Sequence, residues 1–196
     1  MITPISSTSI STAAGILNAG GVVVIPTDTV YGIAAHPGQK DAVARICTIK
    51  GRPTGKPIAL LAADSAAIDH FGAIFPAVAK RLASMYWPGA LTLVLPCGAG
   101  FEGFRVPAHD GARELIAACG GILRVTSANL SGEMPATCAV ESLKDVGLEA
   151  DLVLDGGVSP GGVASTVVKV SQDGKLTVIR EGAILSEDIL KFEEQH

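Results

Sequence analysis

Residues 22–25 are VVVI and are followed directly by PTDTVYG at residues 26–32. A short apolar run that is rich in β-branched residues is typical of a strand buried inside a sheet. Pro26 and Gly32 bracket the polar residues that come next and predict a turn. The stretch therefore indicates a buried strand that ends in hydroxyl and carboxylate groups. In α/β sheets, ligands bind where loops leave the strands, so we expect the chemistry of this chain in such loops.

The rest of the chain shows helical and strand-like patterns in turn. Apolar residues at helical spacing predict helices, and short apolar runs between turn residues predict strands. Strands and helices alternate early and strands cluster later, which predicts one α/β domain, residues 1–196, with a twisted mixed sheet. We expect one helix after a cap at Ser6 or Ser7 and a short last helix after a cap at Ser186. The other expected helices cover 41–49, 77–86 and 110–119, and Asp110 caps the last of these. The other expected strands are 58–62, 91–95, 122–125, 152–154, 165–170 and 176–180.

Composition limits the class of protein. Of the 196 residues, 48% are apolar and 17% are charged, which allows a sizeable core and excludes a disordered chain. The formal net charge is −4, yet the first hundred residues contain seven Lys and Arg against four Asp and Glu. The remaining residues contain eight against fifteen. A basic excess in the half that holds most of the polar motifs is consistent with an anion site there.

The N-terminal segment and the cysteines predict a cytoplasmic protein. Residues 1–27 are uncharged, but proline and glycine interrupt them and they lack a basic start, so neither a signal peptide nor a membrane span is expected. The four cysteines lack C-x-x-C spacing, which argues for reduced thiols. The histidines lack metal-ligand spacing, and no G-x-S-x-G motif is present, so neither a protein-held metal nor a catalytic triad is expected.

The first polar motif is the turn that contains Thr27, Asp28, Thr29 and Tyr31. Small hydroxyl groups in a turn after a strand suit a compact polar ligand such as an amino acid. An ordinary Asx or Ser/Thr turn, which satisfies its own backbone, uses the same residues and is the commoner case. Both interpretations stay open at this point.

The second motif is KGRPTGKP at residues 50–57, which places Lys50, Arg52 and Lys56 between an expected helix and an expected strand. Arginine can bind a phosphate chain through two N–H groups and lysine as a point charge, so a rigid loop of this kind suits a polyphosphate. The loop lacks the G-x-x-x-x-G-K-[ST] pattern of a P-loop. A solvated basic loop is the alternative.

The third motif is TSANLSG at residues 126–132, just beyond an expected strand. Ser127 and Asn129 supply a hydroxyl and an amide, and backbone N–H groups in such a turn can surround an anion. A capping turn is again the alternative, although an uninterrupted run of this kind is hard to explain as a plain connection.

Arg105, Ser165 and Arg180 are single polar residues beside expected strands. Arg105 is either a clamp for a substrate carboxylate or part of a surface ion pair. Ser165 opens one strand and Arg180 closes another. Because no side-chain nucleophile is evident, the candidates favour an enzyme that positions its substrates over one that forms a covalent intermediate.

Taken in order, PTDTVYG, KGRP, WPGALTLVL, RVPAH, TSANLSG, STVV and REG resemble motifs of the YrdC/TsaC family of L-threonylcarbamoyladenylate synthases. Their order and approximate spacing match from Ser11 to about Ile184. The resemblance implies a single YrdC-like domain, in which a twisted α/β sheet carries a large concave cleft lined by positive charge.

The resemblance also implies a reaction. L-threonine, bicarbonate or CO2, and ATP give threonylcarbamoyl-AMP and pyrophosphate, with Mg²⁺ carried by ATP. The product feeds the t6A modification of tRNA, so tRNA and other proteins of that pathway are implied partners, and a membrane is not. Implied ATP-binding residues are Lys50, Arg52, Lys56, Ser127, Asn129 and Arg180. Implied threonine-binding residues are Thr27, Arg105 and Ser165.

Two alternatives remain. The first is an RNA-binding module that uses the same basic cleft without adenylation. Only eight residues are aromatic, which gives little support to a base-stacking surface. The second is a paralogue with another role, because the chain departs from the family pattern near Leu61, Phe101 and Pro135.

Overall fold

The computed structural model describes residues 1–53 and 55–192. The strands are β1 (Ile2–Pro4), β2 (Val23–Ile25), β3 (Gly32–Ala35), β4 (Leu60–Ala62), β5 (Leu91–Cys97), β6 (Gly100–Arg105), β7 (Ile122–Ser127), β8 (Leu152–Asp155), β9 (Thr166–Val170) and β10 (Leu176–Arg180). The helices are α1 (Ser7–Asn18), α2 (Lys40–Lys50), α3 (Ser65–His70), α4 (Ala77–Tyr86), α5 (Asp110–Ala118), α6 (Ala139–Ser142) and α7 (Ser186–Leu190), with a π-helical turn η1 (Leu143–Gly147).

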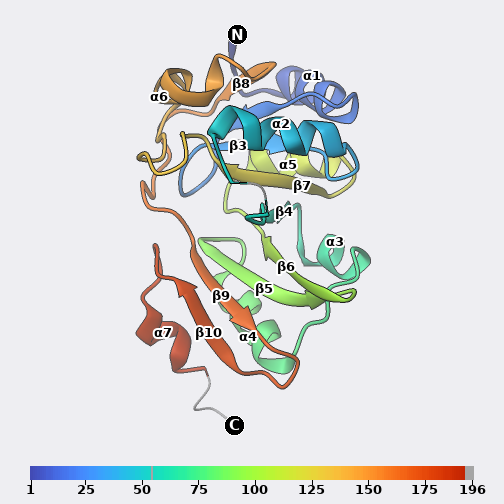
Figure 1. Cartoon of the computed structure of the whole chain (residues 1–196), viewed down its shortest axis with the longest axis vertical. Helices are drawn as coiled ribbons and strands as arrows, with labels where there is room; N and C mark the ends of the chain where they lie inside the picture. The colour runs from blue at the N-terminus through green and yellow to red at the C-terminus, as the bar shows by residue number, and fades with distance from the viewer. Residues whose placement is uncertain (54, 193–196) are drawn as a thin grey trace.

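All ten strands belong to one mixed sheet, in the order β1-β8-β2-β3-β7-β4-β6-β5-β9-β10. Strand β4 has a central place, because it pairs antiparallel with β7 and parallel with β6. Figure 1 shows the consequence: β1, β2, β3, β7 and β8 form an upper half, and β5, β6, β9 and β10 form a lower half. The α/β class with a mixed sheet, predicted from the sequence, is confirmed.

In the upper half, helices cover both faces of the sheet. Val23 and Ile25 of β2 pack in a core with residues of α1 and α5, whereas Val24 packs on the opposite face with residues of α2 and α6. Alternate residues of a strand point to opposite faces, so a strand covered on both sides is apolar throughout. This explains the uninterrupted apolar run of the sequence.

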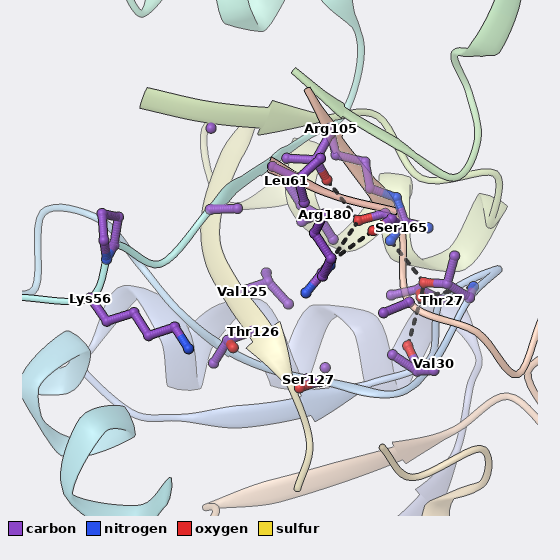
Figure 2. Close-up of a pocket in the computed structure, with 18 of the residues that line it drawn as sticks. Thr27, Val30, Lys56, Leu61, Arg105, Val125, Thr126, Ser127, Ser165 and Arg180 are labelled. Carbon is purple, nitrogen blue, oxygen red and sulfur yellow. Dashed lines mark hydrogen bonds between the residues drawn. The ribbon is translucent and has the colours of Figure 1, made fainter. Parts of the chain in front are cut away.

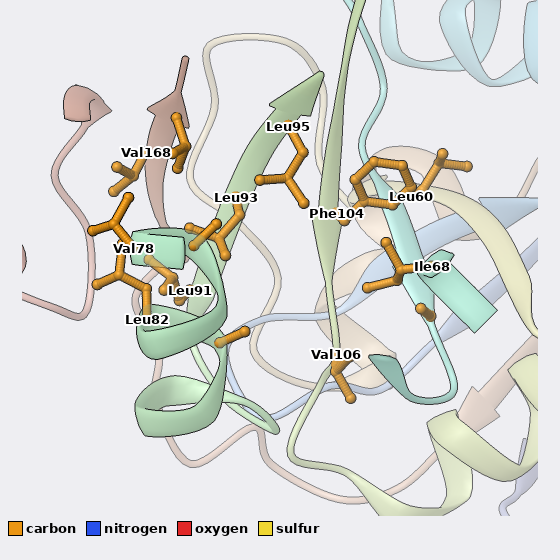
Figure 3. Packing of buried hydrophobic residues seen from close by; sticks show 14 of the residues in the cluster. Leu60, Ile68, Val78, Leu82, Leu91, Leu93, Leu95, Phe104, Val106 and Val168 are labelled. Carbon is orange, nitrogen blue, oxygen red and sulfur yellow. The ribbon is translucent and has the colours of Figure 1, made fainter. Parts of the chain in front are cut away.

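In the lower half, helices pack against one face of the sheet. Figure 3 shows the core on that face, to which α3, α4, β5, β6 and β9 contribute. Leu91, Leu93 and Leu95 of β5 are buried in this core, and the intervening Thr92 and Val94 line a cavity on the opposite face. The alternation along β5 therefore separates the core from the site.

Several strands, the short helices α3 and α6, and the turn η1 escaped the sequence patterns. Strands β3 (GIAA) and β6 (GFEGFR) contain glycine and alanine, which are depleted in strands, and β1 has only three residues. The predicted strand 122–125 ends too early, because β3 pairs with Thr126 and Ser127 and extends β7 through them. Helix α3 spans only six residues, too few for a visible period.

Two predicted caps are wrong, and one is confirmed. Ser6 caps α1 as expected, because its hydroxyl accepts the Ser9 N–H. Helix α5 is capped by His109, whose Nδ1 accepts the Ala112 N–H at 3.1 Å, and not by Asp110. Ser186 is the first residue of α7 and does not cap it. A cap is the last extended residue before the helix, and the path of the incoming chain decides which residue that is.

The His109 cap predicts a loss of stability in acid. Burial lowers the pKa of His109 below its ordinary value, so the unfolded chain takes up this proton at higher pH than the folded chain. The stability that the neutral His109 cap contributes is complete above the ordinary histidine pKa. It declines as the pH falls below that value, because protonated Nδ1 no longer accepts a hydrogen bond. Urea unfolding between pH 8 and pH 5 tests this. His109→Asn should flatten the pH dependence, whereas the same change at the exposed His70 should leave it as steep as in the wild type.

Candidate active site

A cavity of about 700 Å³ opens between the two halves of the molecule. Its charged lining consists of Lys50, Arg52, Lys56, Arg105 and Arg180, and no Asp or Glu of residues 1–53 and 55–192 lines it. Figure 2 shows Lys56 at one end, Thr27, Arg105 and Ser165 at the other, and Arg180 between them. A concave surface with charge of one sign attracts a ligand of the opposite sign. The cavity therefore suits an anion.

The rest of the lining is largely apolar. It combines side chains of the lower-half strands with those of β4 and β7 and includes Leu61, Val94, Phe101, Val125, Val167 and Ile179. Ligand sites commonly combine an apolar surface with a few convergent polar groups. A ligand that carries both phosphates and a flat or aliphatic part fits this division.

Lys50 is the last residue of α2 and is 2% exposed, so it does not belong to a solvated loop. Its ammonium group donates to the carbonyl oxygens of Ser127 and Asn129. Burial, with a smaller contribution from the charge of Arg52, lowers the pKa of Lys50 to about 8. The alternative of a solvated basic loop is therefore wrong for Lys50, because two carbonyl groups hold its charge inside the protein.

Arg52 closes the basic loop. Its Nε donates to the Lys56 carbonyl oxygen at 3.3 Å, and its Nη2 donates to that of Pro57 at 2.7 Å. The guanidinium has five N–H groups, so these bonds leave others available to a ligand. Thr54, which belongs to the same sequence motif, lies outside the described residues.

Asn129 shapes the turn after β7. Its side-chain amide donates to the carbonyl oxygens of Leu130 and Glu133, each at 2.8 Å. Its Oδ1 is buried and has no partner among the described residues. The amide N–H groups are therefore committed to the turn, while Ser127 on β7 lines the cavity.

The hydroxyl groups of the Thr27 turn bind mainly to one another. Thr27 Oγ1 donates to the Val30 carbonyl oxygen at 2.6 Å and accepts the Thr29 N–H at 3.2 Å. The two threonine oxygens lie 3.1 Å apart, and Arg105 Nη1 donates to Thr29 Oγ1 at 2.8 Å. A hydroxyl offers one proton and two lone pairs, so Thr27 is fully used within the turn. Thr29 retains one acceptor position.

Arg105 is held from three sides. It donates through Nε to the Gly89 carbonyl oxygen at 2.9 Å, through Nη1 to Thr29, and through Nη2 to Asp28 Oδ1 at 2.5 Å. Its side chain is 6% exposed and that of Asp28 is 12% exposed. Burial lowers the pKa of Arg105, and the Asp28 carboxylate opposes that shift. Of its five N–H groups, two have no partner in the described part of the chain.

Ser165 and Arg180 join this end of the cavity to the basic loop. Ser165 Oγ lies 2.8 Å from Thr92 Oγ1, and Arg180 Nη2 donates to the Ser165 carbonyl oxygen at 2.8 Å. Burial lowers the pKa of Arg180, and the charge of Arg52 adds to that effect. The cationic groups therefore influence one another across the cavity.

All nine residues that the sequence singled out for ATP or threonine line this one cavity. Sequence analysis missed Thr92 and gave no role to Asp28 or Thr29 within the quoted turn. A signal existed for Thr92, because it is a polar residue inside the apolar run LTLVL at residues 91–95. The pairing of Asp28 with a residue far along the chain left no such signal.

The fold and the cavity define an α/β protein with a basic cleft whose lining suits an anionic ligand. Residues 15–182 match the Sua5_yciO_yrdC family model, which is described as "Telomere recombination". The chain belongs to this family, as the sequence motifs had indicated.

Individual relatives agree with this assignment. The chain is 37% identical over 191 residues to the threonylcarbamoyl-AMP synthase of Bacillus subtilis (strain 168), a match that covers 92% of this chain and 55% of the relative. It is similar to the crystal structure of P. abyssi Sua5 complexed with L-threonine, with a TM-score of 0.89, 32% identity, and coverage of 98% of this chain and 59% of the other. It is also similar to E. coli YciO, with a TM-score of 0.82, 29% identity, and coverage of 93% and 95%. The chain thus spans little more than half of the first two relatives.

No helix in residues 1–53 and 55–192 combines the length and the apolar character that a membrane crossing requires.

Proposed function

We propose that this chain makes threonylcarbamoyl-AMP and pyrophosphate from L-threonine, bicarbonate or CO2, and ATP. The observation that carries the proposal is that nine motif residues line one cavity. Lysine and arginine side chains that suit a polyphosphate lie at one end, and a buried arginine lies among threonine hydroxyl groups at the other. The B. subtilis relative is named for this activity. The product would serve the t6A modification of tRNA, as the family resemblance implies.

The triphosphate of ATP belongs at the basic end. Lys50, Arg52, Lys56 and Arg180 line it, and in the described residues no carboxylate of the lining opposes them. Arginine and lysine together can neutralise the phosphates while backbone and hydroxyl groups orient them. The apolar part of the cavity then remains for the nucleoside.

Threonine belongs at the opposite end. Its carboxylate can accept the two N–H groups that Arg105 leaves unused, and its hydroxyl can donate to the free acceptor position of Thr29. Thr27 and Ser165 shape the same end, but the hydroxyl of Thr27 is already used inside its turn. We therefore propose that Thr29 accepts the hydrogen bond from the substrate hydroxyl. Thr27 contacts the substrate without such a bond.

The chemistry needs positioning more than a reactive side chain. The neutral threonine amine adds to CO2 and loses one proton to solvent, which gives a carbamate, and a carbamate oxygen then attacks the α-phosphorus of ATP. The new O–P bond forms as the bond to the β-phosphate breaks, and pyrophosphate leaves with the electron pair. Arg52, Lys56 and Arg180 stabilise the charge on the phosphates, and the fixed Arg105 holds the nucleophile in place. No catalytic nucleophile of the protein is assigned.

Mg²⁺ and tRNA are part of the proposal. Among the described residues, no three or more His, Cys, Asp or Glu side chains lie together where they could hold a metal, and the charged side chains of the cavity lining are cationic. In this proposal Mg²⁺ arrives bound to the phosphates of ATP and neutralises part of their charge. Transfer of the product to tRNA requires the other proteins of the t6A pathway.

Pyrophosphate release from ATP in the presence of bicarbonate and different amino acids tests the proposal. We expect turnover with threonine, and with serine a loss of about 10–100-fold, because one buried methyl group is worth about 1–3 kcal/mol. Valine should lose more than about 100-fold, because it leaves the Thr29 acceptor unpaired. Equal rates with valine and threonine would remove Thr29 from its role. Salt-sensitive RNA binding without any ATP turnover would replace the enzyme by the RNA-binding module.

A further inference from the structure

Arg124 of β7 and Glu102 of β6 form an ion pair between the two strands that flank β4. Two nitrogen atoms of Arg124 donate to the two Glu102 carboxylate oxygens, at 2.7 and 2.9 Å. The side chains are 20% and 28% exposed. Neither residue lines the cavity, although their neighbours Gly103 and Val125 do. The pair therefore lies behind the cavity and connects the two halves of the molecule.

The same guanidinium holds the end of the basic loop. Arg124 Nη1 donates to the Ile58 carbonyl oxygen at 2.6 Å, and Arg52 donates to the two preceding carbonyl oxygens, of Lys56 and Pro57. Three consecutive carbonyl groups thus accept hydrogen bonds from two arginines. Pro57 has no N–H group, so this part of the chain cannot form the regular backbone hydrogen bonds of a strand. The arginine side chains supply the donors for these carbonyl groups instead.

Both ends of the basic loop are fastened to β7 and to the turn after it. At the entry, the Lys50 ammonium group donates to carbonyl groups of that segment, and the Ser131 N–H donates to the Lys50 carbonyl oxygen at 2.9 Å. At the exit, Arg124 holds Ile58, and the Val125 N–H donates to the Ala59 carbonyl oxygen at 2.9 Å. Contacts with β7 and the turn after it therefore fix the positions of the loop cations.

We propose that Arg124, oriented by Glu102, is a positioning residue for the triphosphate site. It touches no ligand, but it fixes the residue that follows the loop and thereby the place of Lys56 in the cavity. Without that anchor, binding of a polyphosphate would have to order the loop, which costs affinity. The inference rests on the proposed function only in taking this loop as the phosphate site.

The chain offers a matched control in Arg45 of α2. Its Nη1 and Nη2 donate to the two carboxylate oxygens of Asp151, at 2.7 and 3.2 Å, and Nη2 donates to the Glu149 carbonyl oxygen at 2.6 Å. The chemistry is the same as at Arg124: a forked pair with a carboxylate and one carbonyl group. Arg45 does not line the cavity. Lysine cannot reproduce either fork, because its ammonium group is a single point charge.

The experiment compares Arg124→Lys with Arg45→Lys by calorimetric titration with inorganic tripolyphosphate, and with thermal unfolding of both variants. We expect Arg124→Lys to raise the Kd for tripolyphosphate by about tenfold and Arg45→Lys to change it by less than about twofold. The KM for threonine should stay near the wild-type value in both variants, because the threonine end is held by other contacts.

A shift in Kd of the same size in both variants, or in neither, would overturn the inference, since the pair would then be only structural. If Arg124→Lys does not fold, Glu102→Gln gives the answer: it keeps an acceptor for Arg124 but removes the opposing charge, and it should raise the Kd by about threefold. An unchanged Kd in that variant would also overturn it. Tripolyphosphate binding by a wild-type protein that releases no pyrophosphate with threonine would reject the proposed function and leave this inference standing.

Discussion

Replacement of Arg105 by lysine is expected to reduce threonine-dependent pyrophosphate release by roughly 10²–10³-fold, while tripolyphosphate still binds. The guanidinium donates to Gly89, Thr29 and Asp28 at once and keeps two N–H groups for the substrate. Lysine keeps the charge opposite Asp28 but cannot occupy three fixed directions. The effect should therefore fall on catalysis with threonine and much less on the phosphate end.

Steady-state turnover and tripolyphosphate titration of the same preparation check this prediction. Arg113→Lys is the matched control, because Arg113 also pairs with an aspartate and a carbonyl group but does not line the cavity. The control should remain close to wild type. An Arg105→Lys variant with nearly normal turnover would show that the carboxylate of threonine is bound elsewhere.

The second large effect concerns Lys50→Met compared with Lys56→Met. Each variant loses one of the cations that we assign to the phosphates, so each should weaken tripolyphosphate binding by more than about tenfold. Lys50→Met should also unfold earlier, because the carbonyl groups of Ser127 and Asn129 lose their donor at about 1–3 kcal/mol each. The buried charge of Lys50 itself destabilises the fold, as its lowered pKa of about 8 indicates. Removal of that charge therefore offsets part of the loss in stability.

We expect a net loss of about 2 kcal/mol, which corresponds to a fall in Tm of about 4–8 °C for a chain of this length. Thermal unfolding followed by circular dichroism gives the comparison, with Lys56→Met as the reference for loss of charge alone. Equal Tm values for the two variants would mean that Lys50 binds phosphate without supporting the fold.

Local patterns in the sequence were sufficient for most of the fold. The apolar run at residues 22–25 predicts a strand buried on both faces, and β2 has this environment. The spacing of apolar residues also gives the bounds of α4, residues 77–86, as observed. Strands β3 and β6 remained hidden, because their glycines and alanines become strand only through pairing with β7, β4 and β5.

The members of the site were also visible in the sequence, because cations and hydroxyl groups cluster in short motifs. The burial and the hydrogen-bond partners of these residues were not visible in the sequence. Lys50 looks like part of a solvated loop, but its ammonium group is buried against carbonyl groups 77 and 79 residues away. Thr27 looks like a free hydroxyl, but its proton is used by Val30.

The sequence by itself indicated the residues that line the cavity and the strand that leads to it, because both depend on residue type and on periodicity over a few neighbours. Tertiary structure alone decided which polar groups of these residues stay available to a ligand. Burial, proton direction and ion pairing depend on what arrives from distant segments, as Asp28 does at Arg105 and Glu102 at Arg124. A hydrogen-bonding group has few donor and acceptor positions, and packing determines which of them the protein itself occupies.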